Sequence, residues 1–131
     1  MGSSHGTVQI LFVDDRPDTV NLFGTLFGFA GYTTRIALSG YEGLELAIEL
    51  RPLVICSDIE MPGMSGFQFA QALRSTPATS NSFLIAISGS DEPELLEESR
   101  TAGFDLCLRK PVAFQVLLRH IEEFLKTIEF D

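Results

Sequence analysis

Short apolar runs and longer amphipathic segments alternate five times along this chain. Near-continuous apolar runs are typical of strands covered on both faces, whereas helices repeat apolar residues every three or four positions. Alternating strands and helices imply a parallel sheet with helices on both faces and right-handed crossovers, so we expect an α/β domain. The predicted strands are residues 8–13, 32–37, 53–58, 83–87 and 106–109, and the predicted helices are residues 17–30, 39–50, 67–74, 90–101 and 113–127.

Glycine and proline mark the expected ends of the first helix. Pro17 fits a first helical turn, where its missing N–H costs nothing, and Gly31 is expected to end the helix. Gly24 and Gly28 weaken the helix and are expected to allow close packing against the sheet. The alternating, β-branched segment 32–37 is predicted to be a strand near an edge of the sheet.

Two later helices carry local signals of their own. Ser39 and Glu42 have the spacing of a capping box, which predicts a helix start. Acidic residues and a proline over residues 90–94 predict the start of another helix. The side chains expected to be buried are Leu44, Ala47 and Ile48 in the second helix, Leu95 and Leu96 in the fourth, and Phe114, Leu117, Leu118, Ile121, Leu125 and Ile128 in the fifth.

Polar residues stand at the ends of four predicted strands. Asp14 and Asp15 follow residues 8–13, and Asp58 ends residues 53–58. Ser88 follows residues 83–87, and Lys110 follows residues 106–109. Ligands of open α/β sheets bind outside the carboxyl ends of the strands. If the strands are parallel, three carboxylates, a hydroxyl and an ammonium therefore converge on one edge and form a site.

These side chains suit a divalent cation and a phosphoryl group. Mg²⁺ prefers hard oxygen ligands and keeps several waters, so Asp14 and Asp15 could hold it. Asp58 could be a nucleophile toward phosphorus or a third metal ligand. Lys110, held extended by the following proline, could pair with a carboxylate or phosphate, and Ser88 could donate to a phosphoryl oxygen. Each residue alone also fits a turn, cap or surface position, but their joint placement favours a functional site.

Composition and charge narrow the classes of partner. The 131 residues carry a net charge of −9, which argues against nucleic-acid binding because the phosphate backbone attracts basic surfaces. No apolar run is long enough to span a bilayer, so no membrane association is expected. Cys56 and Cys107 lack metal-type spacing and are expected to be reduced thiols in a cytoplasmic protein. We expect a disordered leader or cloning remnant over residues 1–6, one domain over residues 7–127 and a C-terminal tail over residues 128–131.

The strand-end motifs together resemble those of response-regulator receiver domains, the CheY-like family of two-component signalling. The resemblance covers residues 7–127 and is carried by Asp14-Asp15, the loop DIEMPGMSG over residues 58–66, Ser88-Gly89 and Lys110-Pro111. It implies a flavodoxin-like (βα)5 fold with strand order 2-1-3-4-5.

The resemblance also implies a role for each residue of the site. Asp58 would accept the phosphoryl group, so the domain would be a regulatory phosphoacceptor and not a classical enzyme. Lys110 would bridge the phosphoryl group, and the Ser88 hydroxyl would move toward it. The ligands of Mg²⁺ or Mn²⁺ would be Asp15 directly, Asp14 mainly through water, Asp58, and the backbone carbonyl of Glu60.

Partners follow from the same resemblance. The phosphoryl donor would be a histidine kinase or a histidine phosphotransfer protein that packs near Arg16, Thr19 and Leu22. Phosphorylation would shift the face formed by helix 90–101, strand 106–109 and helix 113–127, where a second copy or an output domain could bind. Cys107 stands where family members commonly carry an aromatic residue, so we expect a loop shift driven by Ser88 without an aromatic rotation.

Two other functions match part of the pattern. A pseudo-receiver would bind partners without being phosphorylated, but the complete set of acids, hydroxyl and amine favours phosphorylation. An aspartate-nucleophile phosphatase could use Asp58, but such enzymes usually have a second aspartate where this chain has Glu60. Their motif also follows the first strand, whereas here it follows the third predicted strand.

Overall fold

The computed structural model describes residues 8–128, and these residues form five strands that alternate with five helices. The expected leader over residues 1–6 and the last residues of the expected tail lie outside the described residues. The strands are β1 (Ile10–Val13), β2 (Thr34–Ala37), β3 (Val54–Asp58), β4 (Phe83–Ser88) and β5 (Leu106–Arg109). The helices are α1 (Pro17–Phe29), α2 (Gly40–Leu50), α3 (Gly66–Arg74), α4 (Pro93–Ala102) and α5 (Phe114–Ile128).

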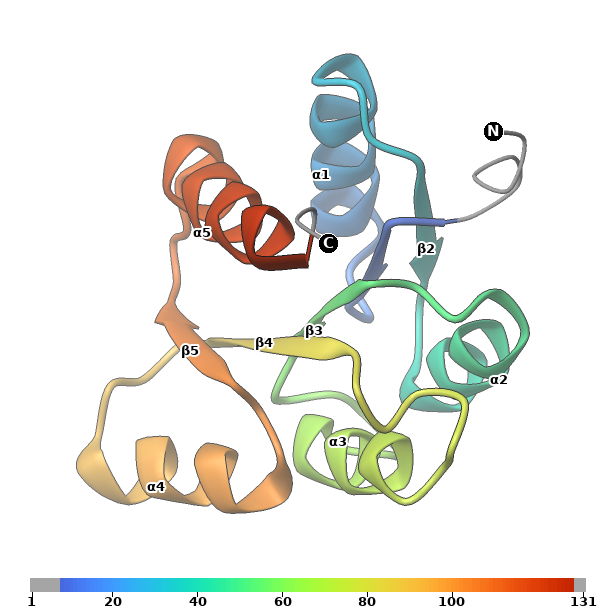
Figure 1. Ribbon diagram of the computed structural model, residues 1–131. Helices are drawn as coiled ribbons and strands as arrows, with labels where there is room; N and C mark the ends of the chain where they lie inside the picture. The colour runs from blue at the N-terminus through green and yellow to red at the C-terminus, as the bar shows by residue number, and fades with distance from the viewer. Residues whose placement is uncertain (1–7, 129–131) are drawn as a thin grey trace.

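The five strands form one parallel sheet in the order β2-β1-β3-β4-β5, as predicted. β2 is an edge strand, which also agrees with the sequence. Helices α1 and α5 cover one face of the sheet, and α2, α3 and α4 cover the other (Figure 1). All five strands therefore point their carboxyl ends at the same edge. Within residues 8–128, no helix is long and apolar enough to cross a membrane.

Each face of the sheet has its own apolar core. On the face of α1 and α5, the ring of Phe27 lies 5.3 Å from that of Phe12 and 4.9 Å from that of Phe114. Phe27 is fully buried, so these contacts join both helices to the central strand β1. On the other face, Phe69 and Leu73 of α3 are fully buried against the sheet. The two cores hold the strands from both sides and keep the carboxyl edge in place.

Helix starts differ in part from the prediction. The Ser39 hydroxyl accepts the N–H of Glu42 at 3.1 Å, but the Glu42 carboxylate accepts the N–H of Leu38 and not that of Ser39. Only half of the expected capping box therefore forms at α2. A complete capping box forms at α3, where Ser65 and Gln68 accept each other's backbone N–H groups.

Four predictions of packing were wrong. Ile48 and Leu96 are 42% and 36% exposed, because the small residues on their helices face the sheet. Gly24 lies close to β2, where an added Cβ would be 3.2 Å from Ile36, so the expected close packing is correct there. Gly28 is exposed and an added Cβ would meet nothing within 4 Å, so no close approach requires it. Ile128, expected on the buried side of α5, is 43% exposed.

The amino edge of the sheet is held by one arginine that the sequence did not single out. The guanidinium of Arg74 donates to the carbonyls of Ser80, Ser82 and Gly103 and pairs with Asp105 at 2.8 Å. Asp105 also accepts the N–H of Leu84 in β4. The planar fork of an arginine suits such multiple contacts. Arg74 thus ties α3 to the chain before β4 and before β5.

Gly66 starts α3 directly against the end of β3. Its N–H donates to the Ile59 carbonyl at 2.7 Å, and an added Cβ would lie 2.5 Å from the Asp58 carbonyl oxygen. Both neighbours are backbone atoms, which cannot move aside as a flexible side chain can. Only glycine therefore lets the α3 start approach the residue that ends β3.

We expect Gly66→Ala to destabilise the protein by roughly 1–3 kcal/mol, the range for overpacked sites. Gly28→Ala is the matched control, because it adds the same methyl group to an open helical position. It is expected to stabilise by about 0.5–1 kcal/mol through better helix propensity. Urea denaturation followed by circular dichroism measures both values. Equal effects of the two substitutions would contradict the proposed close approach at Gly66.

Candidate functional site

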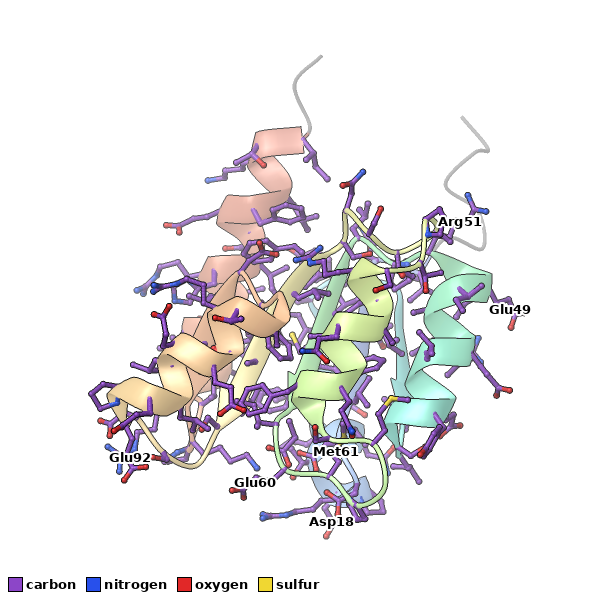
Figure 2. The ribbon with its side chains drawn as sticks, turned by 90° about the horizontal axis from the view of Figure 1, so that it is seen from below. Asp18, Glu49, Arg51, Glu60, Met61 and Glu92 are labelled. Atoms are coloured by element: carbon purple, nitrogen blue, oxygen red, sulfur yellow. The ribbon has the colours of Figure 1, made fainter. Side chains whose placement is uncertain are left out.

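Three carboxylates meet at the carboxyl edge of the sheet. Asp14 and Asp15 follow β1, Asp58 ends β3, and each offers a carboxylate oxygen within 4.8 Å of the others. Asp14 and Asp58 are buried, whereas Asp15 is exposed. Figure 2 shows Glu60 and Met61 of the following loop at this end of the molecule, opposite the end that carries Arg51. The structure thus brings together the acids that the sequence placed on one edge.

The surroundings of Asp14 disfavour its negative charge. Burial raises its pKa above the usual aspartate value, and the neighbouring Asp58 acts in the same direction. The backbone N–H of Arg16, which donates to Asp14 Oδ1 at 3.0 Å, lowers the pKa, as does the charge of Lys110. Burial is the largest of these effects, so an added positive charge nearby would stabilise the charged form of the Asp14 carboxylate.

Lys110 supplies the positive charge of this site. Its Nζ lies 2.9 Å from Oδ1 of Asp58, and its side chain is only partly exposed. The backbone N–H of Lys110 donates to the Ser88 carbonyl at 2.7 Å, which extends the pairing of β4 with β5 past Arg109. The Lys110-Pro111 peptide bond is cis. Of the two partners that the sequence allowed for this ammonium, a carboxylate or a phosphate, the contact of Nζ with Asp58 is the carboxylate.

Ser88 is buried at the end of β4, but its hydroxyl is engaged by its own loop. It donates to the Ser90 carbonyl at 2.9 Å and accepts the Ser90 N–H at 3.0 Å. Within residues 8–128 the hydroxyl has no hydrogen bond to Asp58. Ser88 lies at the carboxyl edge of the sheet, as the sequence predicts. The structure adds that the hydroxyl proton of Ser88 is donated to the Ser90 carbonyl.

Glu60 follows Asp58 by two residues, and its side chain is exposed at the same end of the molecule (Figure 2). Between them, the N–H of Ile59 donates to the Ile87 carbonyl at 3.1 Å. This bond carries the pairing of β3 with β4 to the start of the loop. The backbone of Glu60 therefore leaves the sheet next to the acid cluster.

Two of the acids border a small, mainly apolar cavity. A cavity of about 30 Å³ is bordered by Asp14 and Asp58 and otherwise mainly by apolar side chains, among them Phe12, Phe23 and Leu117. Removal of water from one side of a carboxylate disfavours its charged form, which accounts for the effect of burial on Asp14. Asp14 and Asp58 are thus shielded from water on this side, whereas Asp15 is exposed to it.

The two cysteines are free thiols on different parts of the sheet. Cys56 is buried and borders the same cavity, and burial raises its pKa. Cys107 is half-buried on β5; burial raises its pKa as well, while a hydrogen bond with Ser99 acts in the opposite direction. Burial therefore disfavours the thiolate form of both cysteines.

One ion pair near the site was not predicted. Arg109 Nη1 lies 2.9 Å from Asp91 Oδ2 in the loop between β4 and α4. The residues are eighteen positions apart, and each is an ordinary exposed charge when read from the sequence. Only the pairing of β4 with β5 brings them together.

The donor set fits a hard divalent cation. Mg²⁺ takes oxygen ligands and retains water, and this site offers carboxylate oxygens close together with one side open. The same arrangement presents a buried carboxylate beside an ammonium. The site can therefore hold a cation and accept an anionic group next to Asp58.

Known proteins match the chain along most of its length. The family model described as response regulator receiver domain matches residues 10–122. The polar-differentiation response regulator DivK of Brucella ovis is 28% identical over 119 residues, which are 91% of this chain and 97% of DivK. The sensor histidine kinase RcsC of Salmonella typhimurium is 28% identical over 128 residues, and the chain spans only 13% of its length.

Solved structures agree with these matches. Chemotaxis protein CheY4 of Vibrio cholerae has a TM-score of 0.84 at 29% identity, covering 89% of this chain and 98% of CheY4. The receiver domain of a histidine kinase from Syntrophus aciditrophicus has a TM-score of 0.85 at 26% identity, covering 95% of both chains. The parallel sheet, the strand order and the family model that matches residues 10–122 agree: the chain belongs to the response regulator receiver domains of two-component signalling.

Proposed function

We propose that this receiver domain accepts a phosphoryl group on Asp58. The observation that carries the proposal is the surroundings of this carboxylate: it is buried, its Oδ1 lies 2.9 Å from Lys110 Nζ, and two further carboxylates lie within 4.8 Å. A phosphoryl group added there would meet positive charge from Lys110 and from a cation held by the acids. The role is regulatory and not that of a classical enzyme.

The transfer breaks one bond to phosphorus and forms another. An oxygen of the Asp58 carboxylate attacks the phosphorus of a phosphohistidine or a small acyl phosphate, and the leaving nitrogen or oxygen keeps the electron pair of the broken bond. The product is an acyl phosphate on Asp58. Lys110 compensates the charge spread over the equatorial oxygens.

The metal of this proposal is Mg²⁺ or Mn²⁺. Asp14, Asp15, Asp58 and the backbone carbonyl of Glu60 would hold it, with Asp14 acting mainly through water. When bound, the ion supplies charge neutralisation at the transferred group. The mutual proximity of the three acids supports this ligand set.

Phosphorylation would add roughly 1.5 to 2 negative charges at Asp58. We propose that this charge draws the Ser88 hydroxyl and Lys110 inward and shifts the face of α4, β5 and α5. A second copy or an output domain would bind that face. α4 exposes three glutamates, Glu94, Glu97 and Glu98, together with Arg100, which pairs with Glu97.

The donor would be a histidine kinase or a histidine phosphotransfer protein, in the cytoplasm. Arg16 and Leu22 at the α1 side are exposed, with Leu22 at 57%, and Thr19 is partly exposed. Arg16 donates its N–H to Asp14, and Thr19 borders the same cavity as Asp14 and Asp58, so exposed residues beside the acid cluster support the proposed contact with the donor.

The first test is incubation with acetyl phosphate and Mg²⁺ followed by intact mass measurement. We expect one phosphoryl adduct per chain, absent in Asp58→Asn and absent when EDTA replaces Mg²⁺. Glu49→Gln is the matched control and should form the adduct normally, because it removes an exposed carboxylate of α2 at the end of the molecule that carries Arg51 (Figure 2). No adduct on the unmodified protein would support a pseudo-receiver, and continuous release of phosphate from esters would support a phosphatase.

A second expected result concerns stability with and without the cation. Mg²⁺ binds only the folded site, so it should raise the free energy of unfolding by about 2.7 kcal/mol at one hundred times its Kd. Thermal denaturation over a Mg²⁺ titration measures this gain. Asp15→Asn should reduce it, whereas Asp18→Asn, an exposed acid in the first turn of α1, should leave it unchanged. An equal gain in both variants would contradict the proposed ligand set.

Asp14→Asn should stabilise the metal-free protein at neutral pH. An aspartate whose pKa is raised by folding binds protons more tightly when folded, so its charge costs stability above that pKa. The cost disappears as pH falls below the unfolded value of 3.8. Urea denaturation in EDTA should therefore show the largest gain near pH 7 and none near pH 3. The exposed Asp15→Asn should give a smaller gain.

A further inference from the structure

The loop between β4 and α4, residues 89–92, is bonded to its own strand end. The Ser88 hydroxyl donates to the Ser90 carbonyl at 2.9 Å and accepts the Ser90 N–H at 3.0 Å. A hydroxyl has a single proton to donate. Ser88 therefore cannot donate to a phosphoryl oxygen on Asp58 until its bond to Ser90 is released.

A second bond holds the same loop to the neighbouring strand. Asp91 Oδ2 lies 2.9 Å from Nη1 of Arg109, the last residue of β5. Arg109 is opposite Ser88 in the sheet, and the next residue, Lys110, donates its N–H to the Ser88 carbonyl. Arg109 thus belongs to a strand of the sheet, whereas Asp91 belongs to the β4–α4 loop. This loop must shift if Ser88 is to release its bond to Ser90.

We propose that Arg109 and Asp91 are positioning residues that hold the β4–α4 loop in the arrangement where Ser88 is bonded to Ser90. This inference rests on the proposed phosphorylation of Asp58. The loop has room to shift, because an added Cβ on Gly89 would meet nothing within 4 Å. When the phosphoryl group draws Ser88 inward, the Asp91–Arg109 pair opens or stretches with the loop.

The exposure of the pair limits the size of its effect. The side chains of Arg109 and Asp91 are 60% and 66% exposed, and a surface ion pair of this kind changes an equilibrium by a factor of about 1.4 to 5. The pair therefore tunes the loop equilibrium and does not block it. Salt should weaken the effect, since the Debye length falls to about 3 Å at 1 M.

The test is the affinity of the full chain for beryllofluoride with Mg²⁺, measured by isothermal titration calorimetry. Beryllofluoride stands in for a phosphoryl group on a carboxylate. We expect Arg109→Gln to bind it about 1.4- to 5-fold more tightly than the unmodified protein at low salt, and this gain should shrink at about 1 M salt. The reversed pair, Asp91→Arg with Arg109→Asp, should return the affinity to the original value.

The direction of the change in beryllofluoride affinity distinguishes loop release from the simple loss of a positive charge. Loss of a positive charge near an anion should weaken binding, whereas release of the loop should strengthen it. Arg100→Gln is the matched control, because it removes the same charge from an exposed ion pair that lies within α4. Its affinity should stay unchanged.

A coupling measurement completes the test. In Ser88→Ala the hydroxyl that gains from loop release is absent, so adding Arg109→Gln should then have no effect. Unchanged or weaker binding by Arg109→Gln alone, or a gain in affinity that persists in Ser88→Ala, would overturn the inference.

If the unmodified protein binds no beryllofluoride and forms no adduct with acetyl phosphate, the proposed function is wrong and this inference is wrong with it. Normal binding without an effect of Arg109→Gln overturns only the positioning role.

Discussion

Electrostatic repulsion among three carboxylates is the constraint on which the rest of this structure depends. Asp14, Asp15 and Asp58 lie within 4.8 Å of one another, and two of them are buried. Burial raises the pKa of Asp14, and the neighbouring charge of Asp58 acts in the same direction. Lys110 offsets part of the repulsion through its contact with Asp58. The remaining repulsion favours the arrival of a cation.

The parallel sheet is what imposes this proximity. Its strands deliver Asp14, Asp58, Ser88 and Lys110 to one edge, and the two apolar cores prevent the strands from separating to relieve the repulsion. The start of α3 then fits closely behind Asp58 because Gly66 has no side chain. Stability supplied by the cores thus holds an unfavourable group of charges together at the carboxyl edge of the sheet.

Two neighbouring basic residues at the end of β5 make different contacts. Lys110 reaches inward to Asp58, whereas Arg109 reaches outward to Asp91 in the next loop. One strand end therefore contacts both the acid site and the loop that carries Ser90.

The sequence alone determined the alternation of strands and helices, the parallel sheet and the acids, serine and lysine of one edge, because period, turn residues and strand ends are local properties. Local pattern failed for Ile48, Leu96 and Gly28, whose exposure depends on how each helix is rotated against the sheet. Tertiary structure alone decided the contacts of Arg74, the bond of Ser88 to Ser90 and the Asp91–Arg109 pair. Such contacts join residues by geometry, and an exposed charge has no sequence pattern that reveals its partner.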